Sequence, residues 1–383
     1  LFSKMKDNFI IVISILCLCS CGSSNDINYK KTKRVDHNNT IRNSIELKKN
    51  DVRQNKIHDY FNRKYKRNMF NGNILFAENG QIISHKSYGY ANLKSKEELT
   101  KDHSFQLASV SKPFTSVATL QLIGNGQIKL EDTLQKFFPN LPYKGITVHQ
   151  LLCHRSGLSQ YTHFCDSPDS IWPDKSKTIN NEDVISIISK INPLINYSPD
   201  RRYYYCNTNY LLLASIVEKI SGIEFKQYLK ENIFSPIGMN NSIVYDRTNF
   251  NELIKPTQGY ENKTPWEDVY LNGVVGDKGI YSTTMDLLKF DRALQQNLLI
   301  NDTLKKLAFS KKNKDYNKNK NYGYGFRLKD HTNYGKIVYH TGWWKGYRSY
   351  FIKVLKNDQT IIVLNNVKRG RFLNIDKLIG LIN

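Results

Sequence analysis

Apolar and polar positions alternate near both ends of the chain, whereas the middle carries apolar residues at helical spacing. Two short runs, 73–77 and 81–85, flank Asn79-Gly80, a dipeptide typical of tight hairpin turns. Towards the C-terminus, runs rich in β-branched and aromatic residues predict strands at 324–328, 336–339, 349–355 and 360–364, with Asn357-Asp358 as the last turn. This order predicts one antiparallel sheet built from both ends of the chain, with a helical insertion between them.

The expected helices rest on apolar residues that recur every three or four positions. Gly222 stands where a helix stop is expected, and Thr283-x-x-Asp286 is typical of a capping box. The pattern predicts helices from about residue 51, over 109–123, 182–191 and 209–220, after 283, and over about 372–381.

The first residues differ from the rest of the chain. Lys4 and Lys6 precede an apolar run over 9–18, which leads into Leu18-Cys19-Ser20-Cys21. A basic start, a short apolar run and a small residue before the cut are typical of a secretory signal peptide. The run is shorter than the roughly 20 residues that span a membrane. Residues 18–21 resemble a bacterial lipoprotein box, which implies lipidation at Cys21.

These features predict three segments. Residues 1–21 are expected to be a lipoprotein signal peptide, and residues 22–51, which are polar and aperiodic, a flexible tether. Residues 52–383 are expected to fold as one domain. We therefore expect an exported protein held to a membrane of the cell envelope by its lipid anchor, in the periplasm, at the outer membrane or at the cell surface.

The net charge of +22 first suggests a nucleic-acid partner. Much of the excess lies in two segments, because residues 1–70 hold 15 Lys/Arg against six Asp/Glu and residues 301–330 hold nine against three. No recognised nucleic-acid module accompanies this charge, so we expect no nucleic-acid partner. Anionic lipid or cell-wall polymer is the more plausible contact for an exported basic protein, and a solvated lysine-rich surface is the simplest interpretation.

Three cysteines lie beyond the N-terminal segment, Cys153, Cys165 and Cys206. An odd number excludes a complete disulfide framework. Pairing of Cys153 with Cys165 and buried thiols remain alternatives. Residues 22–383 contain no H-E-x-x-H and no C-x-x-C, so we expect neither a metal nor an organic cofactor.

Candidate chemistry begins at Ser109-Val110-Ser111-Lys112, an S-x-x-K tetrad that opens a predicted helix. Residues i and i+3 of a helix lie about 5–6 Å apart on one face, so Lys112 can reach the Ser109 hydroxyl. A serine is a poor nucleophile until a neighbouring base takes its proton. The N–H of Ser109 at a helix start also suits a developing oxyanion. Taken alone, such a tetrad more often marks a helix cap.

Tyr205-Cys206-Asn207 precedes another predicted helix. A tyrosine beside a lysine can be driven towards phenolate, and it can then relay the serine proton. Asn207 offers an amide donor and an acceptor, which suits a substrate amide. A structural aromatic run is the alternative, because residues 203–205 are all tyrosine.

His340-Thr341-Gly342-Trp343 ends a predicted strand. A glycine in a strand often marks the close approach of another backbone or a ligand. A substrate can lie along this edge, with the Trp343 N–H completing an oxyanion hole beside the N–H of Ser109. His340 and Thr341 would then bind a substrate carboxylate. An ordinary hairpin is the alternative.

The order and spacing of these motifs resemble the penicillin-recognising serine hydrolases, a superfamily that includes class C β-lactamases, D-Ala-D-Ala carboxypeptidases and related esterases. Three further runs of this chain, 151–158, 233–239 and 276–287, are similar to looser signatures of that superfamily. The resemblance covers about residues 55–380. It implies an α+β fold of the β-lactamase/transpeptidase type, with a five-stranded antiparallel sheet flanked by helices, an all-helical lobe, and the site between the two.

The resemblance also implies roles for the motif residues. Ser109 is the acylated nucleophile, Lys112 is the positive neighbour that eases its deprotonation, and Tyr205 is the general base. Asn207 holds the substrate amide. The edge against which substrate lies is formed by His340, Thr341 and Gly342. No metal or organic cofactor is implied.

Two positions depart from the pattern of the superfamily. His340 stands where most β-lactamases carry lysine, and a histidine titrates near pH 6.5. The grip on an anionic substrate is therefore expected to be weaker and pH-dependent. Lys278 stands where the looser signature has glycine.

Together these observations predict an exported serine hydrolase that works through an acyl-enzyme. The expected substrate is a small peptide of D-alanyl type, a peptidoglycan fragment, an amide or an ester. A true β-lactamase, and a catalytically idle cell-wall-binding or sensor module on the same fold, are the alternatives.

Overall fold

The computed structural model describes residues 35–48, 51–165, 172, 174–314 and 319–383, which all belong to one compact unit. The predicted signal peptide, Cys21 and the first part of the predicted tether lie outside the described residues. No helix among the described residues has both the length and the apolar character needed to cross a membrane.

The last part of the predicted tether is folded. It contains α1 (Asn38–Asn43) and β1 (Glu46–Leu47), which pairs in parallel with β3 (Gln81–Tyr88). Ile41 is buried in the core, and the His37 N–H donates to the Pro236 carbonyl oxygen at 2.7 Å. The prediction of a flexible tether is therefore wrong for these residues. A helix of six residues is too short to show an apolar period in the sequence.

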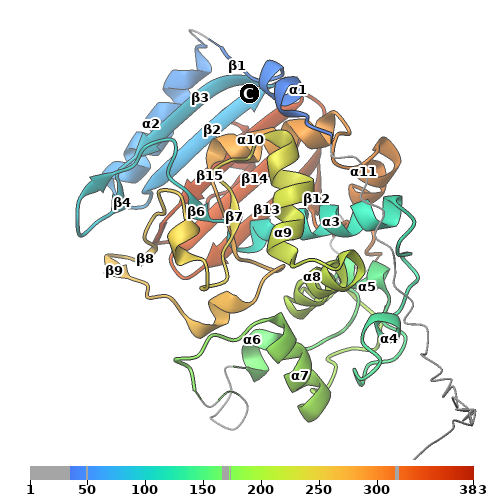
Figure 1. Cartoon of the computed structure of the whole chain (residues 1–383). Coiled ribbons are helices and arrows are strands. Elements are labelled where there is room, and N and C mark those ends of the chain that lie inside the picture. Colours follow the sequence, from blue (N-terminus) through green and yellow to red (C-terminus); the bar gives the residue numbers. More distant parts are fainter. Residues whose placement is uncertain (1–34, 49–50, 166–171, 173, 315–318) are drawn as a thin grey trace, which may run out of the picture. The chain divides into compact units, whose positions relative to one another are not determined.

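One sheet of eight strands organises the domain, in the order β1-β3-β2-β15-β14-β13-β12-β11 (Figure 1). The five consecutive strands from β3 to β13 are antiparallel and correspond to the expected sheet. Three short strands at the two edges make the sheet wider than expected. The further strands are β2 (Gly72–Glu78), β15 (Gln359–Asn365), β14 (Tyr347–Val354), β13 (Gly335–Trp344), β12 (Arg327–His331) and β11 (Lys320–Tyr322).

The hairpin predicted near the N-terminus and the first strand predicted near the C-terminus had different outcomes. The turn at Asn79-Gly80 is confirmed, because both residues have positive φ angles, 51° and 79°. The strand predicted at 324–328 is present but begins three residues later, as β12 (Arg327–His331). The backbone turns at Gly325 (φ 80°), where an added Cβ would lie 2.4 Å from the Cβ of Ser116, so the chain needs glycine for a close approach to α3 (Lys112–Gly124).

Each face of the sheet packs against its own set of helices (Figure 1). Ile74 and Phe76 of β2 face a cluster that includes α2 (Arg53–Lys66) and α12 (Ile375–Ile379). Leu75 and Ala77 face the opposite way, into the larger cluster with α3 and α10 (Thr284–Gln295). The period-two alternation of the strands thus separates two apolar layers.

The middle of the chain supplies the predicted helical lobe (Figure 1). Its helix α8 (Thr208–Ser221) packs on α3, which is buried along almost its whole length between the lobe and the sheet. The predicted helices at 182–191 and 209–220 are confirmed within one residue at each end, and Gly222 ends α8 with φ 72°. The lobe comprises α4 (Leu134–Phe137), α5 (Val148–Leu152), α6 (Tyr161–Phe164), α7 (Asn181–Ile191), α8 (Thr208–Ser221) and α9 (Phe225–Leu229).

The remaining elements are short. The Thr283 side chain caps α10 by accepting the Asp286 N–H, which is one of the two hydrogen bonds of the predicted capping box. The last helix is shorter than expected. Cys153 and Cys165 are both buried thiols, so the structure does not pair them. The short elements are β4 (Tyr90–Asn92), β5 (Glu97–Glu98), β6 (Phe105–Gln106), η1 (Ala108–Ser111), η2 (Lys230–Phe234), η3 (Ser235–Ile237), β7 (Ile243–Val244), η4 (Phe250–Glu252), β8 (Tyr260–Glu261), β9 (Thr264–Pro265), η5 (Tyr270–Gly273), β10 (Ile280–Ser282), α11 (Asp302–Ala308) and β16 (Val367–Lys368).

Candidate active site

Ser109 lies in a tight turn at the start of the central helix. The predicted helix over 109–123 begins as the 3₁₀ turn η1 and continues as α3 from Lys112. Ala108, the residue before Ser109, has φ 50°, a left-handed conformation that is strained for a residue with a side chain. Ser109 itself is only half-buried. The turn therefore holds the Ser109 hydroxyl at a surface that a ligand can reach.

Lys112 is fully buried and makes contact with three oxygen atoms. Its Nζ lies 3.2 Å from the Ser109 Oγ, 2.9 Å from the Asn207 Oδ1 and 2.9 Å from the main-chain oxygen of Asp277. An ammonium group has three donors, and these three acceptors use all of them. The predicted contact between Lys112 and Ser109 is thus present, and Asn207 joins the same group.

Tyr205 faces two cations. The Lys112 Nζ lies 5.0 Å from the centre of the Tyr205 ring, and the guanidinium carbon of Arg327 lies 4.9 Å from it. The fully buried ring of His154, which belongs to the 151–158 signature, packs 4.3 Å away and accepts a hydrogen bond from the Cys206 N–H at 3.1 Å. The signature at 151–158 therefore supports the segment that carries Tyr205 and Asn207.

The edge of β13 meets the turn that carries the serine. A Cβ added to Gly342 would lie 2.2 Å from the Leu107 main-chain oxygen and 3.0 Å from the Ala108 Cβ. Only glycine permits this approach, which brings the main chain around Trp343 next to the main chain around Ser109. The predicted oxyanion hole, formed by the N–H groups of these two residues, requires that proximity and stays a prediction. Thr341 is half-buried, and half of the Trp343 side chain is exposed.

His340 is placed differently from what the sequence suggested. It has no exposed surface, its Nε2 lies 3.1 Å from the Tyr322 hydroxyl, and its Nδ1 lies 2.9 Å from the Thr341 main-chain oxygen. Burial lowers the pKa of His340 well below its usual value, and the charges of Arg327 and Lys112 add to the shift. The expected titration near pH 6.5 is therefore wrong, and these contacts argue against a direct grip of His340 on a substrate carboxylate.

Arg327 is the cation that the sequence analysis missed. It begins β12 and is paired with Tyr339, one residue before His340 on the neighbouring strand. Its Nε is buried and has no hydrogen-bond partner among the described residues. A guanidinium stays protonated in proteins, so Arg327 supplies the positive charge that His340 does not. The signal was present in the sequence, since a correct hairpin register between 327–331 and 335–339 would have placed Arg327 beside the H-T-G motif.

Lys278 joins the site through Asp277. Its Nζ donates to the Tyr161 hydroxyl at 2.8 Å and to the Val274 carbonyl oxygen at 2.9 Å, and the Tyr161 hydroxyl donates to the Asp277 carboxylate at 3.1 Å. The main-chain oxygen of Asp277 is in turn a partner of Lys112. Burial lowers the pKa of Lys278 to about 8, opposed by the charge of Asp277 and assisted by that of Lys112. This departure from glycine therefore fixes the segment that anchors Lys112.

The described residues show no cluster of His, Cys, Asp and Glu side chains that could hold a metal ion. The chemistry available is that of a half-buried hydroxyl, a buried lysine, a tyrosine between cations and a glycine edge. Such a set suits nucleophilic attack on a carbonyl group.

Comparison with known sequences agrees with this chemistry. Residues 59–380 match the family model described as Beta-lactamase. The chain is 34% identical over 332 residues to penicillin-binding protein 4* of Bacillus subtilis, a match that covers 82% of this chain and 73% of that protein. It is 25% identical over 235 residues to a D-aminopeptidase of Brucella anthropi, covering 58% of this chain and 42% of the relative.

Solved structures agree with the fold. The octameric penicillin-binding protein homologue from Pyrococcus abyssi superposes with a TM-score of 0.72 at 24% identity, covering 82% of this chain and 73% of that chain. The D-amino acid amidase from Ochrobactrum anthropi gives a TM-score of 0.71 at 22% identity, covering 90% and 98% of the two chains. At these identities the likeness concerns the fold alone.

Proposed function

This chain belongs to the β-lactamase family and is a serine hydrolase, and we propose that it cleaves D-alanyl-type peptides, amides or esters through an acyl-enzyme on Ser109. The contact that carries the proposal is the 3.2 Å approach of the Lys112 Nζ to the Ser109 Oγ, in a site that Asn207 and Tyr205 share.

Acylation begins with the Ser109 hydroxyl. As its Oγ attacks the substrate carbonyl carbon, its proton passes to the Tyr205 oxygen, whose negative charge the two nearby cations stabilise. The carbonyl oxygen becomes an oxyanion, and the N–H groups of Ser109 and Trp343 donate to it. When the tetrahedral centre collapses, the bond to the leaving group breaks and Tyr205 returns the proton to that group. Water then repeats these steps on the acyl-enzyme and releases Ser109.

Arg327 favours substrates that carry a carboxylate close to the scissile bond. Its buried Nε has no partner among the described residues, although guanidinium donors inside a protein are normally hydrogen-bonded. A planar guanidinium matches a carboxylate in shape and charge. Asn207, held at the same site by Lys112, can bind the substrate amide. These features support a peptide with a free C-terminal carboxylate ahead of a neutral ester.

The substrate class is tested with three compounds: a D-Ala-D-Ala peptide, a chromogenic cephalosporin and a short p-nitrophenyl ester. The proposal predicts turnover of the peptide with the highest kcat/KM, and loss of all turnover in Ser109→Ala. Preferred hydrolysis of the cephalosporin would instead identify a true β-lactamase. Saturable binding of the peptide with no turnover of any compound would identify an idle binding module.

We also propose that the chain is exported and held to the membrane by a lipid on Cys21. The basic start, the apolar run over 9–18 and the Leu18-Cys19-Ser20-Cys21 motif support this location. In a bacterial host, labelled fatty acid should enter the native chain and not Cys21→Ala. Equal labelling of both would remove the anchor from Cys21.

A further inference from the structure

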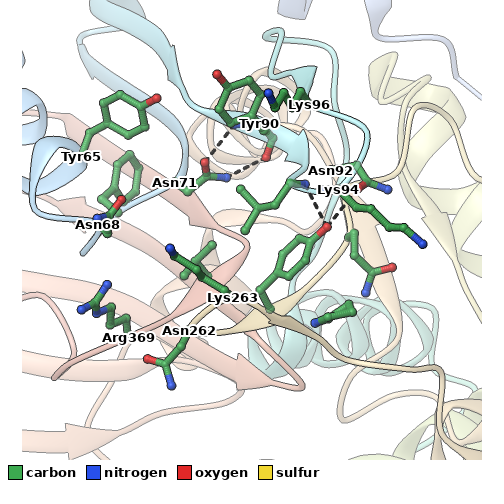
Figure 2. A pocket seen from close by; sticks show the side chains of 16 residues that line it. Tyr65, Asn68, Asn71, Tyr90, Asn92, Lys94, Lys96, Asn262, Lys263 and Arg369 are labelled. Carbon is green, nitrogen blue, oxygen red and sulfur yellow. Dashed lines mark hydrogen bonds between the residues drawn. The ribbon is translucent and has the colours of Figure 1, made fainter.

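A second cavity lies outside the site of Ser109 (Figure 2). Its volume is about 710 Å³, within the roughly 300–1,000 Å³ of typical ligand sites. It lies between the end of α2 and the short hairpins β4–β5 and β8–β9, and 16 residues line it. We call it the basic pocket and define it by Tyr65, Tyr90, Lys94, Lys96, Lys263 and Arg369.

The charge of the basic pocket is of one sign. Lys94, Lys96, Lys263 and Arg369 are all exposed, and none of them forms an ion pair with another described residue. The described lining contains no Asp or Glu. Of the nearby carboxylates, Glu261 pairs with Lys368 at 2.6 Å, and Glu98, which is cross-strand from Tyr90, is exposed. Four cations that form no ion pair among the described residues create a positive potential that favours an anionic ligand.

Partly buried hydrogen bonds fix the walls of the basic pocket. The Tyr260 hydroxyl accepts the Leu93 N–H at 2.9 Å and donates to the Asn92 Oδ1 at 3.1 Å, which joins the two hairpins. Asn71 holds β4 from the other side, because its Nδ2 donates to the Tyr90 carbonyl oxygen at 2.7 Å and its Oδ1 accepts the Tyr90 N–H at 2.9 Å. Figure 2 shows both sets of bonds. The turns that carry Lys94, Lys96 and Lys263 are therefore held in place before any ligand binds.

The backbone beside Arg369 is held in the same way. The Arg348 guanidinium donates to the main-chain oxygens of Arg369, Gly370 and Arg371 at 3.1, 2.7 and 3.1 Å. The two terminal nitrogens of Arg348 thus hold the backbone, and Arg369 lines the pocket as a separate cation.

The rest of the lining suits a ring that carries hydroxyl groups. Tyr65 and Tyr90 are half-buried and lie across the pocket from Asn262, Lys263 and Arg369 (Figure 2). A tyrosine ring offers an apolar face with a polar tip, and asparagine amides donate to and accept from hydroxyl groups. We propose that the basic pocket binds an anionic saccharide, a sugar ring that bears a carboxylate or a phosphate.

The basic pocket does not depend on the proposed hydrolysis. Trp343 of β13 is in register with Arg348, Asn365 and Gly72 on the next three strands, and Asn71 follows directly. Three strand spacings of about 4.8 Å place Asn71 roughly 14 Å from Trp343, whereas the Lys368 Nζ, next to the lining residue Arg369, lies 4.9 Å from the Trp343 ring centre. Ser109 itself does not line the pocket. Binding at the pocket can therefore be measured in a protein that lacks Ser109.

The test uses the whole chain carrying Ser109→Ala, so that no probe is turned over. Calorimetry at low salt measures binding of glucose 6-phosphate, glucuronate, glucose and inorganic phosphate. We expect the two anionic sugars to bind at least tenfold more tightly than either glucose or phosphate alone. A stronger response to glucose 6-phosphate than to glucuronate assigns a phosphate as the anion, and the reverse assigns a carboxylate.

Two charge-matched double variants test whether the anionic sugars bind at the basic pocket. Lys263→Glu with Arg369→Glu changes the net charge by the same amount as Lys144→Glu with Lys190→Glu, whose lysines are exposed in the helical lobe. The first pair should weaken binding of the anionic sugars at least tenfold, and the second pair less than twofold. Tyr65→Ala should weaken the sugars and leave phosphate unchanged. Equal weakening by both pairs, phosphate binding as tightly as the sugar phosphates, or no binding at all would each overturn the proposal.

Discussion

The Ser109 site and the basic pocket both hold positive charge, but in different surroundings. Lys112 and Lys278 are buried, and their donors are used by oxygen atoms of the protein. Lys263 and Arg369 are exposed and have no carboxylate partner among the described residues. Buried charge in a fixed network suits a reaction, since its field is strong and its geometry constant. Exposed charge on rigid turns suits recognition, because water screens it and a ligand can displace that water.

Replacing Lys112 separates the two regions most strongly. Lys112→Met removes the cation that contacts Ser109, Asn207 and Tyr205, so we expect kcat/KM to fall by at least about 10³-fold. Binding of an anionic sugar at the basic pocket should change less than twofold in the same variant. Steady-state kinetics and calorimetry on one preparation measure both effects. Turnover close to that of the native chain would remove Lys112 from the reaction.

Replacing one arginine at each site tests whether the two sites act separately: Arg327 lies at the Ser109 site, and Arg369 is exposed at the basic pocket. Arg327→Met should raise KM for a D-Ala-D-Ala peptide about 30-fold, near the lower end of the roughly 2–5 kcal/mol lost when a buried charge pair is broken. In the same variant, KM for a neutral ester should change less than threefold. Arg369→Met is the matched control and should leave both substrates unchanged. The same loss for ester and peptide in Arg327→Met would show that Arg327 acts on the fold or on Tyr205 and not on a substrate carboxylate.

The pH dependence of kcat tests the buried lysine next. Lys278 has a pKa lowered to about 8 by burial, so its ammonium loses its proton as pH rises through that value. The hydrogen bonds that fix Asp277 then weaken, and we expect kcat of the native chain to fall above about pH 8. Lys278→Met should lower kcat about tenfold and lack this alkaline limb.

Lys278→Arg is the control for that experiment. An arginine keeps its charge throughout this pH range, so the pH profile of kcat for Lys278→Arg should also lack the fall above about pH 8. Its kcat should stay above that of Lys278→Met. An unchanged alkaline limb in both variants would assign it to another group.

The smallest expected effect concerns stability in acid. Burial lowers the pKa of five histidines, His58, His85, His149, His154 and His340, so below about pH 6.5 the unfolded chain binds protons that the folded chain does not. Each histidine should therefore remove up to roughly 1.4 kcal/mol of unfolding free energy per pH unit below about pH 6.5. Urea unfolding between pH 7.5 and 5.5 measures the slope of the unfolding free energy against pH.

Variants identify the source of that slope. His340→Gln should lower the slope by up to roughly 1.4 kcal/mol per pH unit, the share of one histidine, whereas His163→Gln, at an exposed position, should leave the slope as it is in the native chain. The slope is the readout because either change can alter the absolute stability. Equal slopes in His340→Gln and the native chain would show that His340 titrates alike in the folded and unfolded states.

The sequence predicted the parts of the molecule that follow from local pattern. The hairpin at Asn79-Gly80 and the helices around 182–191 and 209–220 each carry a turn signal or an apolar stripe of sufficient length. The strand expected at 324–328 begins only at Arg327, because Gly325 turns the backbone against α3, a contact that only the folded chain makes. Helix α1 was missed because it is a single short segment anchored by Ile41.

The same limit applies to the site. The three motifs located Ser109, Lys112, Tyr205 and Asn207, and the structure brings these residues together. Arg327 belongs to no motif and enters through the register of β12 with β13. The burial of His340, which decides its protonation, depends on Tyr322 and on neighbouring strands. The residues that line the basic pocket come from segments distant in the sequence, so no local sequence pattern predicts it.

The central claim is that Ser109 carries the acyl group, and one measurement tests it most directly. The chain is mixed with a penicillin, quenched in acid and digested, and mass spectrometry locates the adduct. We predict a mass increase equal to the whole penicillin, on the peptide that contains Ser109, with no adduct in Ser109→Ala. An adduct on another residue, or an equal adduct in Ser109→Ala, would contradict the account.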